Sequence, residues 1–239
     1  METNTKITQM IRALLQDEGV SLYGFADLRD LPAEQRDGFD YGISIGLALD
    51  KDVLRGIADG PTPDYHANYD RLNERLDALS LLAEKTLIEQ GFKAQANTRE
   101  FVGSGEVIDG TKLPHKTVAT RAGLGWIGKC ALLVTESFGS GIRISSILTD
   151  APLEAADPIN TSHCGNCQVC KNICPAHAIS GTPWVAGLPR EQFWDAKACR
   201  KTARARSIEH LREEITLCGL CILRCPWTQK ALSASVPTE

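Results

Sequence analysis

The chain has 239 residues, 43% of them hydrophobic, and a formal net charge of −4 at neutral pH. This length allows one sizeable core plus a small second domain, and the mild acidity gives no indication of general nucleic-acid binding. The first residues, METNTKITQMIRALLQDEG, lack the apolar core of a signal peptide, and no apolar run is long enough to span a bilayer. We therefore expect a cytoplasmic protein without a membrane segment, in which cysteines stay reduced.

The N-terminal part of the chain predicts an alternation of helices and strands. Apolar side chains recur at helical spacing in two stretches, and Gly19 and Gly91 follow these where a helix C-terminus favours glycine. Other stretches have the alternating period of strands. The predicted helices cover residues 5–18 and 69–87, and the predicted strands cover 22–26, 43–49 and 92–96. Because the elements come in mixed order, we expect an α+β domain rather than a doubly wound sheet.

The middle of the chain is less regular. Residues 101–116 are rich in glycine and turn formers, and a loop of this length inside a domain is usually functional. Two further strands are predicted over residues 131–135 and 144–149. We expect Gly139 and Gly141, which lie between them, to form a hairpin connection.

A cysteine run dominates the C-terminal part. Cys164, Cys167, Cys170 and Cys174, with Pro175 after them, have the spacing C-x2-C-x2-C-x3-C-P. This is the ligand run of bacterial ferredoxins that hold two iron–sulfur clusters. In that arrangement the first three thiolates bind one cluster, and the fourth binds the other cluster. A second run is therefore expected.

The second run is present in altered form. Cys218, Cys221 and Cys225, followed by Pro226, are one cysteine short of a full repeat, and the upstream Cys199 is the natural replacement. The crossover of ligands assigns Cys164, Cys167, Cys170 and Cys225 to cluster one, and Cys174, Cys199, Cys218 and Cys221 to cluster two. Zinc ribbons and disulfides are the alternatives, but neither requires the two C-x3-C-P endings. We predict two [4Fe–4S] clusters.

Gly123, Gly125 and Gly128 satisfy the dinucleotide pattern G-x-G-x-x-G. That pattern works where a strand enters the glycines and a helix leaves them, whereas here a helical segment enters and a β-rich segment leaves. The order argues against a nicotinamide site. Glycines also let the backbone approach a flat ligand on which Trp126 would stack, and the alternative is a tight turn with a core tryptophan.

Several stretches resemble the epoxyqueuosine reductases, which are more distantly related to the corrinoid reductive dehalogenases. They are ATRAGLGWIGK at 119–129, LTD at 148–150, the first cysteine run, GVSLYGFADLRDLP at 19–32 and PDYH at 63–66. The resemblance covers most of the chain. It implies a nitroreductase-like cobalamin-binding domain, which we place at residues 1–155, followed by a ferredoxin-like domain with two [4Fe–4S] clusters at 156–239.

The resemblance also implies a base-off corrinoid held against one cluster. The residues it assigns to this cofactor are Tyr65, His66, Arg121, Gly123, Gly125, Trp126, Gly128 and Lys129. Counting back from the shared R-A-G-L-G places Asp109 at the family's proton donor, although an Asp-Gly turn is the alternative. The residues after Asp109 differ from the family's P-V-L-E-R, and the chain stops soon after Trp227, so both departures count against a tRNA-base substrate.

The expected function is a corrinoid-dependent iron–sulfur reductase. Electrons would come singly from a low-potential ferredoxin or flavodoxin, pass through the two clusters to cobalamin, and reduce a small-molecule or modified-base substrate with Asp109 as acid. One alternative is a non-enzymatic electron-transfer protein, or a reductive activator of a partner corrinoid protein. Another is a flavin reductase of nitroreductase type.

Two features are left over. Cys130, the ninth cysteine, has no cluster partner and is expected to be a small buried residue. The segment between Cys199 and Cys218 is basic, with a solvated helix face as the default interpretation. The alternative interpretations are that the segment docks RNA phosphates or an acidic electron-donor protein. The basic residues are Arg200, Lys201, Arg204, Arg206, His210 and Arg212, and Glu209, Glu213 and Glu214 offset some of their charge.

Overall fold

The computed structural model describes residues 2–102 and 111–234 of the chain. The chain divides into two units, each assembled from separate stretches. Unit 1 comprises residues 1–48, 71–124 and 143–160, and unit 2 comprises residues 49–70, 125–142 and 161–239. The domain division expected at residue 155 stays a prediction. Within the described ranges, no helix combines the length and the apolarity needed to cross a membrane.

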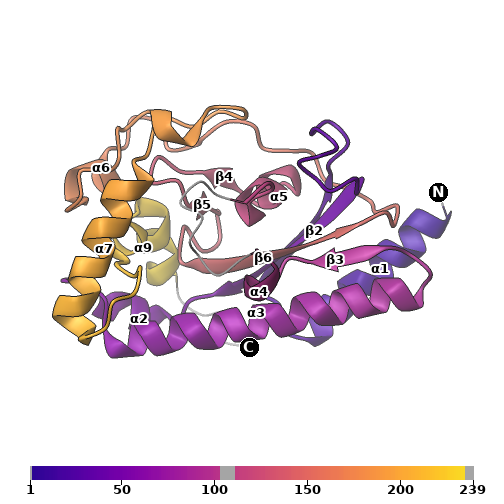
Figure 1. Cartoon of the computed structure of the whole chain (residues 1–239), viewed down its shortest axis with the longest axis horizontal. Coiled ribbons are helices and arrows are strands. Elements are labelled where there is room, and N and C mark those ends of the chain that lie inside the picture. The colour runs from indigo at the N-terminus through magenta and orange to yellow at the C-terminus, as the bar shows by residue number, and fades with distance from the viewer. Residues whose placement is uncertain (1, 103–110, 235–239) are drawn as a thin grey trace. The chain divides into compact units, whose positions relative to one another are not determined.

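A four-stranded sheet forms the framework of unit 1 (Figure 1). Its order is β1 (Leu22–Asp27), β2 (Tyr41–Ala48), β6 (Ile142–Thr149) and β3 (Ala94–Ala96). Strands β1 and β2 pair antiparallel, as do β3 and β6. The central strands β2 and β6 are mostly buried because apolar and small residues fill both of their faces. The predicted α+β class is confirmed.

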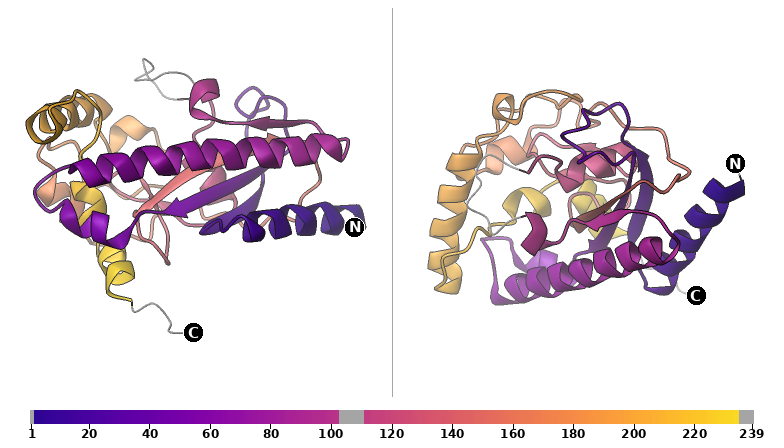
Figure 2. Two further views of the ribbon diagram at one scale, coloured as in Figure 1. Left: turned by 90° about the horizontal axis from the view of Figure 1, so that it is seen from below. Right: turned by 45° about the vertical axis from the view of Figure 1, so that its right-hand side comes forward.

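Two helices predicted from periodicity are confirmed as α1 (Glu2–Asp17) and α3 (Pro63–Glu89). Helix α1 buries Ile7, Ile11 and Leu15. Figure 2 shows the ribbon of α3 running along the strands, and the Ser80 and Ser145 hydroxyls, 2.9 Å apart, join α3 to β6. The 27-residue length of α3 exceeds the prediction because its first turns carry fewer apolar side chains than its later ones.

A short helix, α5 (His115–Arg121), packs closely against the sheet of unit 1. A Cβ on Gly42 of β2 would lie 2.9 Å from the Val118 side chain, so glycine allows this close approach. The single turn α4 (Arg99–Val102) precedes it in the chain. The core at this contact consists of Ala26, Leu28, Leu113, Val118, Ala122 and Leu148.

Unit 2 is built from short elements. They are α2 (Lys51–Gly56), β4 (Trp126–Ile127), β5 (Leu133–Val134), α6 (Val169–Ile173), the 3-10 helix η1 (Arg190–Gln192), α7 (Ala196–Leu211), α8 (Leu220–Leu223) and α9 (Pro226–Ser233). The first residues of α3 also belong to this unit. Short elements leave many loop residues available as ligands, which suits a cofactor-binding unit.

The hairpin predicted around Gly139 and Gly141 is wrong. The strand expected over 131–135 shortens to β5, which pairs with β4, whereas β6 belongs to the four-stranded sheet. Gly139 has a φ of +57°, and a Cβ there would collide with the backbone of Thr228 at the start of α9. Glycine at this position therefore serves a close backbone approach rather than a strand-to-strand turn.

Candidate metal centre

The first cysteine run lies in a turn that leads into α6. Cys167 N donates to Cys164 O at 3.1 Å, Cys170 lies inside α6, and Cys174 is its C-terminal cap. Pro175 cannot continue the helix, and Cys174 adopts an extended conformation with φ −64° and ψ 112°. The helix therefore ends at the fourth cysteine, and the division of the four ligands between two clusters stays a prediction.

Cysteines of both runs meet in one cavity of unit 2. A space of about 60 Å³ is lined by Cys164, Cys167, Cys170 and Cys225, the four expected ligands of cluster one. The pKa of Cys225 is raised, mainly by burial and further by the neighbouring Cys164. The remaining lining residues are Gly128, Lys129, Cys130, Val134, Cys221, Pro226 and Trp227. The fold thus brings the end of the second run to the first run.

Three expected ligands of cluster two also lie near one another. The pKa of Cys199 is raised to about 11, mainly by burial and also by the neighbouring Cys174 and Cys218. Cys199 is on the first turn of α7, whose start is fixed by Asp195 Oδ1 accepting from Ala198 N at 2.9 Å. The fourth expected ligand, Cys221 on α8, lines the cavity of the first set. The assignment of individual cysteines to each cluster stays a prediction.

The set of thiols that lines this cavity suits a cluster. In the described ranges, no three His, Cys, Asp or Glu side chains are close enough together to hold a single metal ion. A four-iron cube binds each thiolate through a different corner iron, so its four sulfur ligands stand farther apart than those of one zinc ion. Four cysteine thiols lining one cavity are the donor set that such a cube takes.

Lys129 is directed at the first cysteine run. Its side chain is buried, with 2% of the residue exposed, and Nζ donates to Gly165 O and Cys167 O, both at 2.8 Å. No carboxylate in the described part of the chain forms an ion pair with it. The sequence assigned Lys129 to the corrinoid, whereas these contacts place its charge beside the cysteine loop.

Cys130 is buried, as expected, but it is not remote from the cluster ligands. It lines the same cavity, and hydrogen bonding with Cys130 is the main cause that raises the pKa of Cys170. Cys130 also interacts with Cys221. Sequence reasoning missed this position because the motif spacing accounts for eight cysteines and does not locate the ninth.

The glycine segment is a helix end followed by a hairpin. Gly123, with φ +67°, ends α5 in the left-handed conformation. A Cβ on Gly125 would collide with Val134 O across the β4–β5 pair. Trp126 has no exposed surface and stacks on His163, with ring centroids 4.6 Å apart. These contacts agree with the alternative named from the sequence, a tight turn with a core tryptophan. The roles of the segment in corrinoid binding stay predictions.

The other residues assigned to the corrinoid have partners in separate units. In unit 2, Tyr65 is buried and a Cβ on Gly219 would lie 3.0 Å from its ring, while His66 Nε2 lies 3.1 Å from Asp70 Oδ2. In unit 1, Arg121 forms an ion pair with Asp30. The assigned residues are therefore not gathered within one unit, and Asp109 lies outside the described residues.

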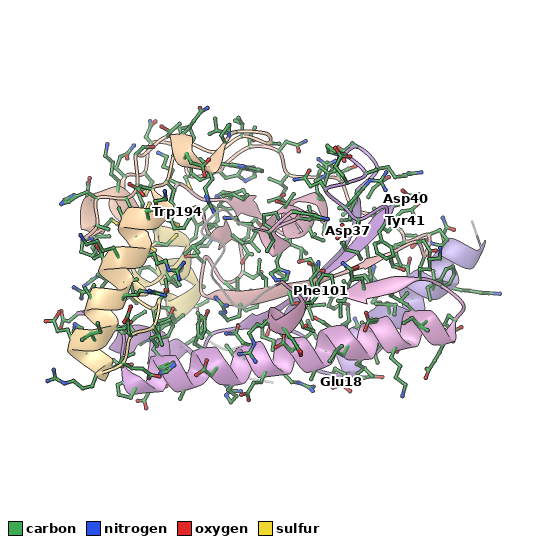
Figure 3. All side chains as sticks on the ribbon, viewed as in Figure 1. Glu18, Asp37, Asp40, Tyr41, Phe101 and Trp194 are labelled. Atoms are coloured by element: carbon green, nitrogen blue, oxygen red, sulfur yellow. The ribbon has the colours of Figure 1, made fainter. Side chains whose placement is uncertain are left out.

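Unit 1 contains a cavity that the sequence did not predict. Its volume is about 230 Å³, and its lining residues are Asp37, Asn97, Phe101, Thr111, Lys112, Leu113 and Leu148. Figure 3 labels Asp37 and Phe101 of this lining. The lining residue Asn97 donates from Nδ2 to Ser146 Oγ at 3.1 Å, and His115 Nδ1 lies 2.9 Å from the same hydroxyl. Burial lowers the pKa of His115 to about 4, so its ring is neutral at neutral pH.

Comparison with known proteins agrees with the cysteine geometry. Residues 163–228 match the family model of the 4Fe–4S double cluster binding domain. An epoxyqueuosine reductase of Synechococcus sp. (strain CC9605) is 36% identical over 129 residues, which cover 54% of this chain and 40% of the relative. One of Synechocystis sp. is 29% identical over 168 residues, covering 70% of this chain and 52% of the relative. The chain thus spans about half the length, or less, of these relatives.

Solved structures share the fold. An epoxyqueuosine reductase bound to an epoxyqueuosine-modified tRNA stem loop matches with a TM-score of 0.61 and 20% identity, covering 94% of this chain and 66% of that chain. A reductive dehalogenase described for B12-dependent dehalogenation matches with a TM-score of 0.69 and 17% identity. The match covers 91% of this chain and 31% of that chain. The predicted resemblance to epoxyqueuosine reductases is confirmed, and the double-cluster domain is present.

Proposed function

We propose, from the double-cluster domain and the similarity to epoxyqueuosine reductases, that this protein is an iron–sulfur reductase. Single electrons would pass through two [4Fe–4S] clusters to a bound corrinoid and then to a substrate. The observation that carries the proposal is the cavity shared by Cys164, Cys167, Cys170 and Cys225. Exchange of one ligand between two runs is the arrangement of two-cluster ferredoxins, which transfer electrons.

The residues around the cavity would hold cluster one and set its properties. A cube bound by four thiolates is anionic, and each added electron makes it more so. The buried ammonium of Lys129 lies beside the loop of Cys164 and Cys167, where little water screens its charge. Net charge and hydrogen bonds near the sulfurs set cluster potentials, so Lys129 would favour the reduced state.

A corrinoid is the electron acceptor in this proposal. It is supported by the fold shared with a reductive dehalogenase described for B12-dependent dehalogenation. When bound, the corrinoid would supply a low-valent metal able to reduce the substrate. Its proposed contacts are the residues named from the sequence. Of these residues, Trp126 stacks on His163 and Lys129 donates to Gly165 O, both within unit 2.

Asp109 is the proposed proton source, since adding electrons to an epoxide or similar group also requires a placed acid. The asparagine substitution keeps the size of the side chain but cannot deliver an acidic proton. Turnover by Asp109→Asn should fall by roughly 10²–10⁴-fold while reduction of the corrinoid by the clusters stays normal. Equal loss of both rates would instead support a structural turn.

The substrate class follows the relatives. One solved relative holds an epoxyqueuosine-modified tRNA stem loop, so a modified base is the first substrate to test, followed by free nucleosides and other small epoxides. A low-potential ferredoxin or flavodoxin is the proposed donor.

The test is anaerobic reconstitution with iron, sulfide and cobalamin, followed by gel filtration. The proposal expects about eight irons and one retained corrinoid per chain, and turnover of the modified stem loop with a reduced donor. Clusters without retained corrinoid would favour an electron carrier for a partner protein. A yellow flavin spectrum beneath the iron–sulfur absorption would favour the nitroreductase alternative.

A further inference from the structure

Helix α7 presents a positively charged stripe on its exposed side. At about 3.6 residues per turn, Lys197, Lys201, Arg204 and Ile208 fall on one face. We call these four residues, together with the helix-capping Arg212, the α7 stripe. An adjoining face is buried through Ala203 and Ser207, whose hydroxyl donates to Ala203 O and to Leu217 O. The stripe lies outside this buried face, and its Lys197, Lys201 and Ile208 are exposed to solvent.

The charges of the α7 stripe are largely uncompensated. Lys197, Lys201 and Arg212 form no ion pair with any carboxylate in residues 2–102 and 111–234. Arg204 pairs with Glu214 at 3.1 Å. The whole chain has a formal charge of −4, so this concentration of positive charge stands out against an acidic protein. A local field of this sign attracts an acidic partner.

An exposed apolar side chain lies among these cations. Ile208 is 48% exposed and lies one helical turn beyond Arg204. An apolar anchor surrounded by charges contributes to a protein interface, whose central contacts are apolar and whose rim is polar. Phosphate contacts of RNA use positive and polar groups and gain nothing from an isoleucine. The stripe therefore suits an acidic protein better than a nucleic acid.

The α7 stripe also lies close to an expected electron acceptor. Cys199, a predicted ligand of cluster two, is on the same helix, and by helical spacing it points away from Ile208. An α-helix with its side chains is about 10 Å across. A protein docked on the stripe would therefore stand roughly one helix diameter from this ligand.

We propose that the α7 stripe docks an acidic one-electron donor protein and that electrons enter at cluster two. In each encounter the reduced donor loses one electron and the oxidised cluster gains it, and no proton or group is transferred. This inference rests on the proposed electron-transfer function of the clusters. It adds the entry point and the charge of the partner.

The test measures electron transfer from a reduced acidic [2Fe–2S] ferredoxin to the reconstituted full chain by anaerobic stopped flow. The variant is Lys197→Glu/Lys201→Glu. Its second-order rate constant should fall about tenfold or more at low salt, because steering is lost. The difference should shrink at 1 M salt, where the Debye length is about 3 Å. Ile208→Ser should lower the rate at every salt concentration.

A matched control is Lys6→Glu/Lys93→Glu, which changes two exposed lysines of unit 1 and alters the net charge equally. The control should keep the wild-type rate, and dithionite should reduce all variants equally. Unchanged transfer in the stripe variant, or an equal fall in the control, would overturn the docking site. So would weaker binding of a tRNA stem loop with unchanged ferredoxin rates. If the reconstituted wild type binds far fewer than about eight irons per chain, the proposed function itself is overturned.

Discussion

At the scale of single residues, Lys129 shows how a buried charge is tied to a function. Burying an ammonium is costly unless it is paired or fully hydrogen-bonded. Here the partners are two carbonyl oxygens of the first cysteine loop, both at 2.8 Å. Lys129 therefore connects the β4–β5 hairpin with the ligand loop and places positive charge beside the thiolates.

A methionine at this position has a similar length but removes both the two hydrogen bonds and the positive charge, and two measurements report the two losses separately. We expect Lys129→Met to lower the free energy of unfolding by about 3 kcal/mol, the scale for two charged hydrogen bonds. We also expect a lower midpoint potential for one cluster, because a neighbouring positive charge is removed. Denaturant unfolding and an EPR-monitored redox titration measure the two quantities. A variant with wild-type stability and potential would show that the contacts have neither role.

The cysteines allow a matched comparison between a predicted ligand and a buried neighbour. Cys199→Ala and Cys218→Ala should each leave about four irons, since both remove a ligand of the same cluster. Cys130→Ala should keep about eight irons, because Cys130 lines the cavity without belonging to either set. Iron analysis of the three reconstituted variants tests these predictions. Eight irons in Cys199→Ala, or four in Cys130→Ala, would overturn the assignment.

At the scale of elements, the β4–β5 hairpin carries Lys129 and Cys130 to the cysteine cavity. The hairpin depends on Gly125, where a Cβ would collide with the carbonyl oxygen of Val134. Backbone atoms cannot move aside as a flexible side chain can. The glycine is therefore required by the pairing of the two strands.

The corresponding prediction is that Gly125→Ala lowers the free energy of unfolding by about 1–3 kcal/mol, the usual cost of overpacking. It should also reduce the iron content, because the hairpin holds residues beside the cysteine cavity. Gly56→Ala is the control, since a Cβ there meets no atom within 4 Å. Thermal unfolding and iron analysis of both variants test the prediction. Equal stability of the two would mean that the hairpin tolerates the change.

The hairpin also shows where sequence reasoning reaches its limit. The cysteine spacing predicted a double-cluster domain because a ligand motif is local and chemically specific. Strand pairing is a tertiary property, so the two-residue β5 was assigned to the wrong partner. The direction of Lys129 depends on a loop far along the chain. Spacing alone therefore could not separate a corrinoid contact from a contact with the cysteine loop.

At the scale of the whole molecule, each unit draws on separate stretches of the chain. Helical and strand periods predicted α1, β1, β2 and α3 well, because these elements have long apolar patterns. Periodicity contains no information on which stretches assemble together. The cavity of unit 1 thus became visible only in the structure, whereas the ligand motif already predicted that the two cysteine runs meet.

In the proposed function, two clusters deliver single electrons to a corrinoid held by this chain. The most direct measurement is the EPR spectrum of anaerobic, cobalamin-loaded protein during stepwise reduction. The account predicts signals of two interacting [4Fe–4S]⁺ clusters, and a cobalt(II) signal that disappears as cobalt takes up a further electron. Signals of a single cluster, or a cobalt(II) signal that persists after both clusters are reduced, would contradict it.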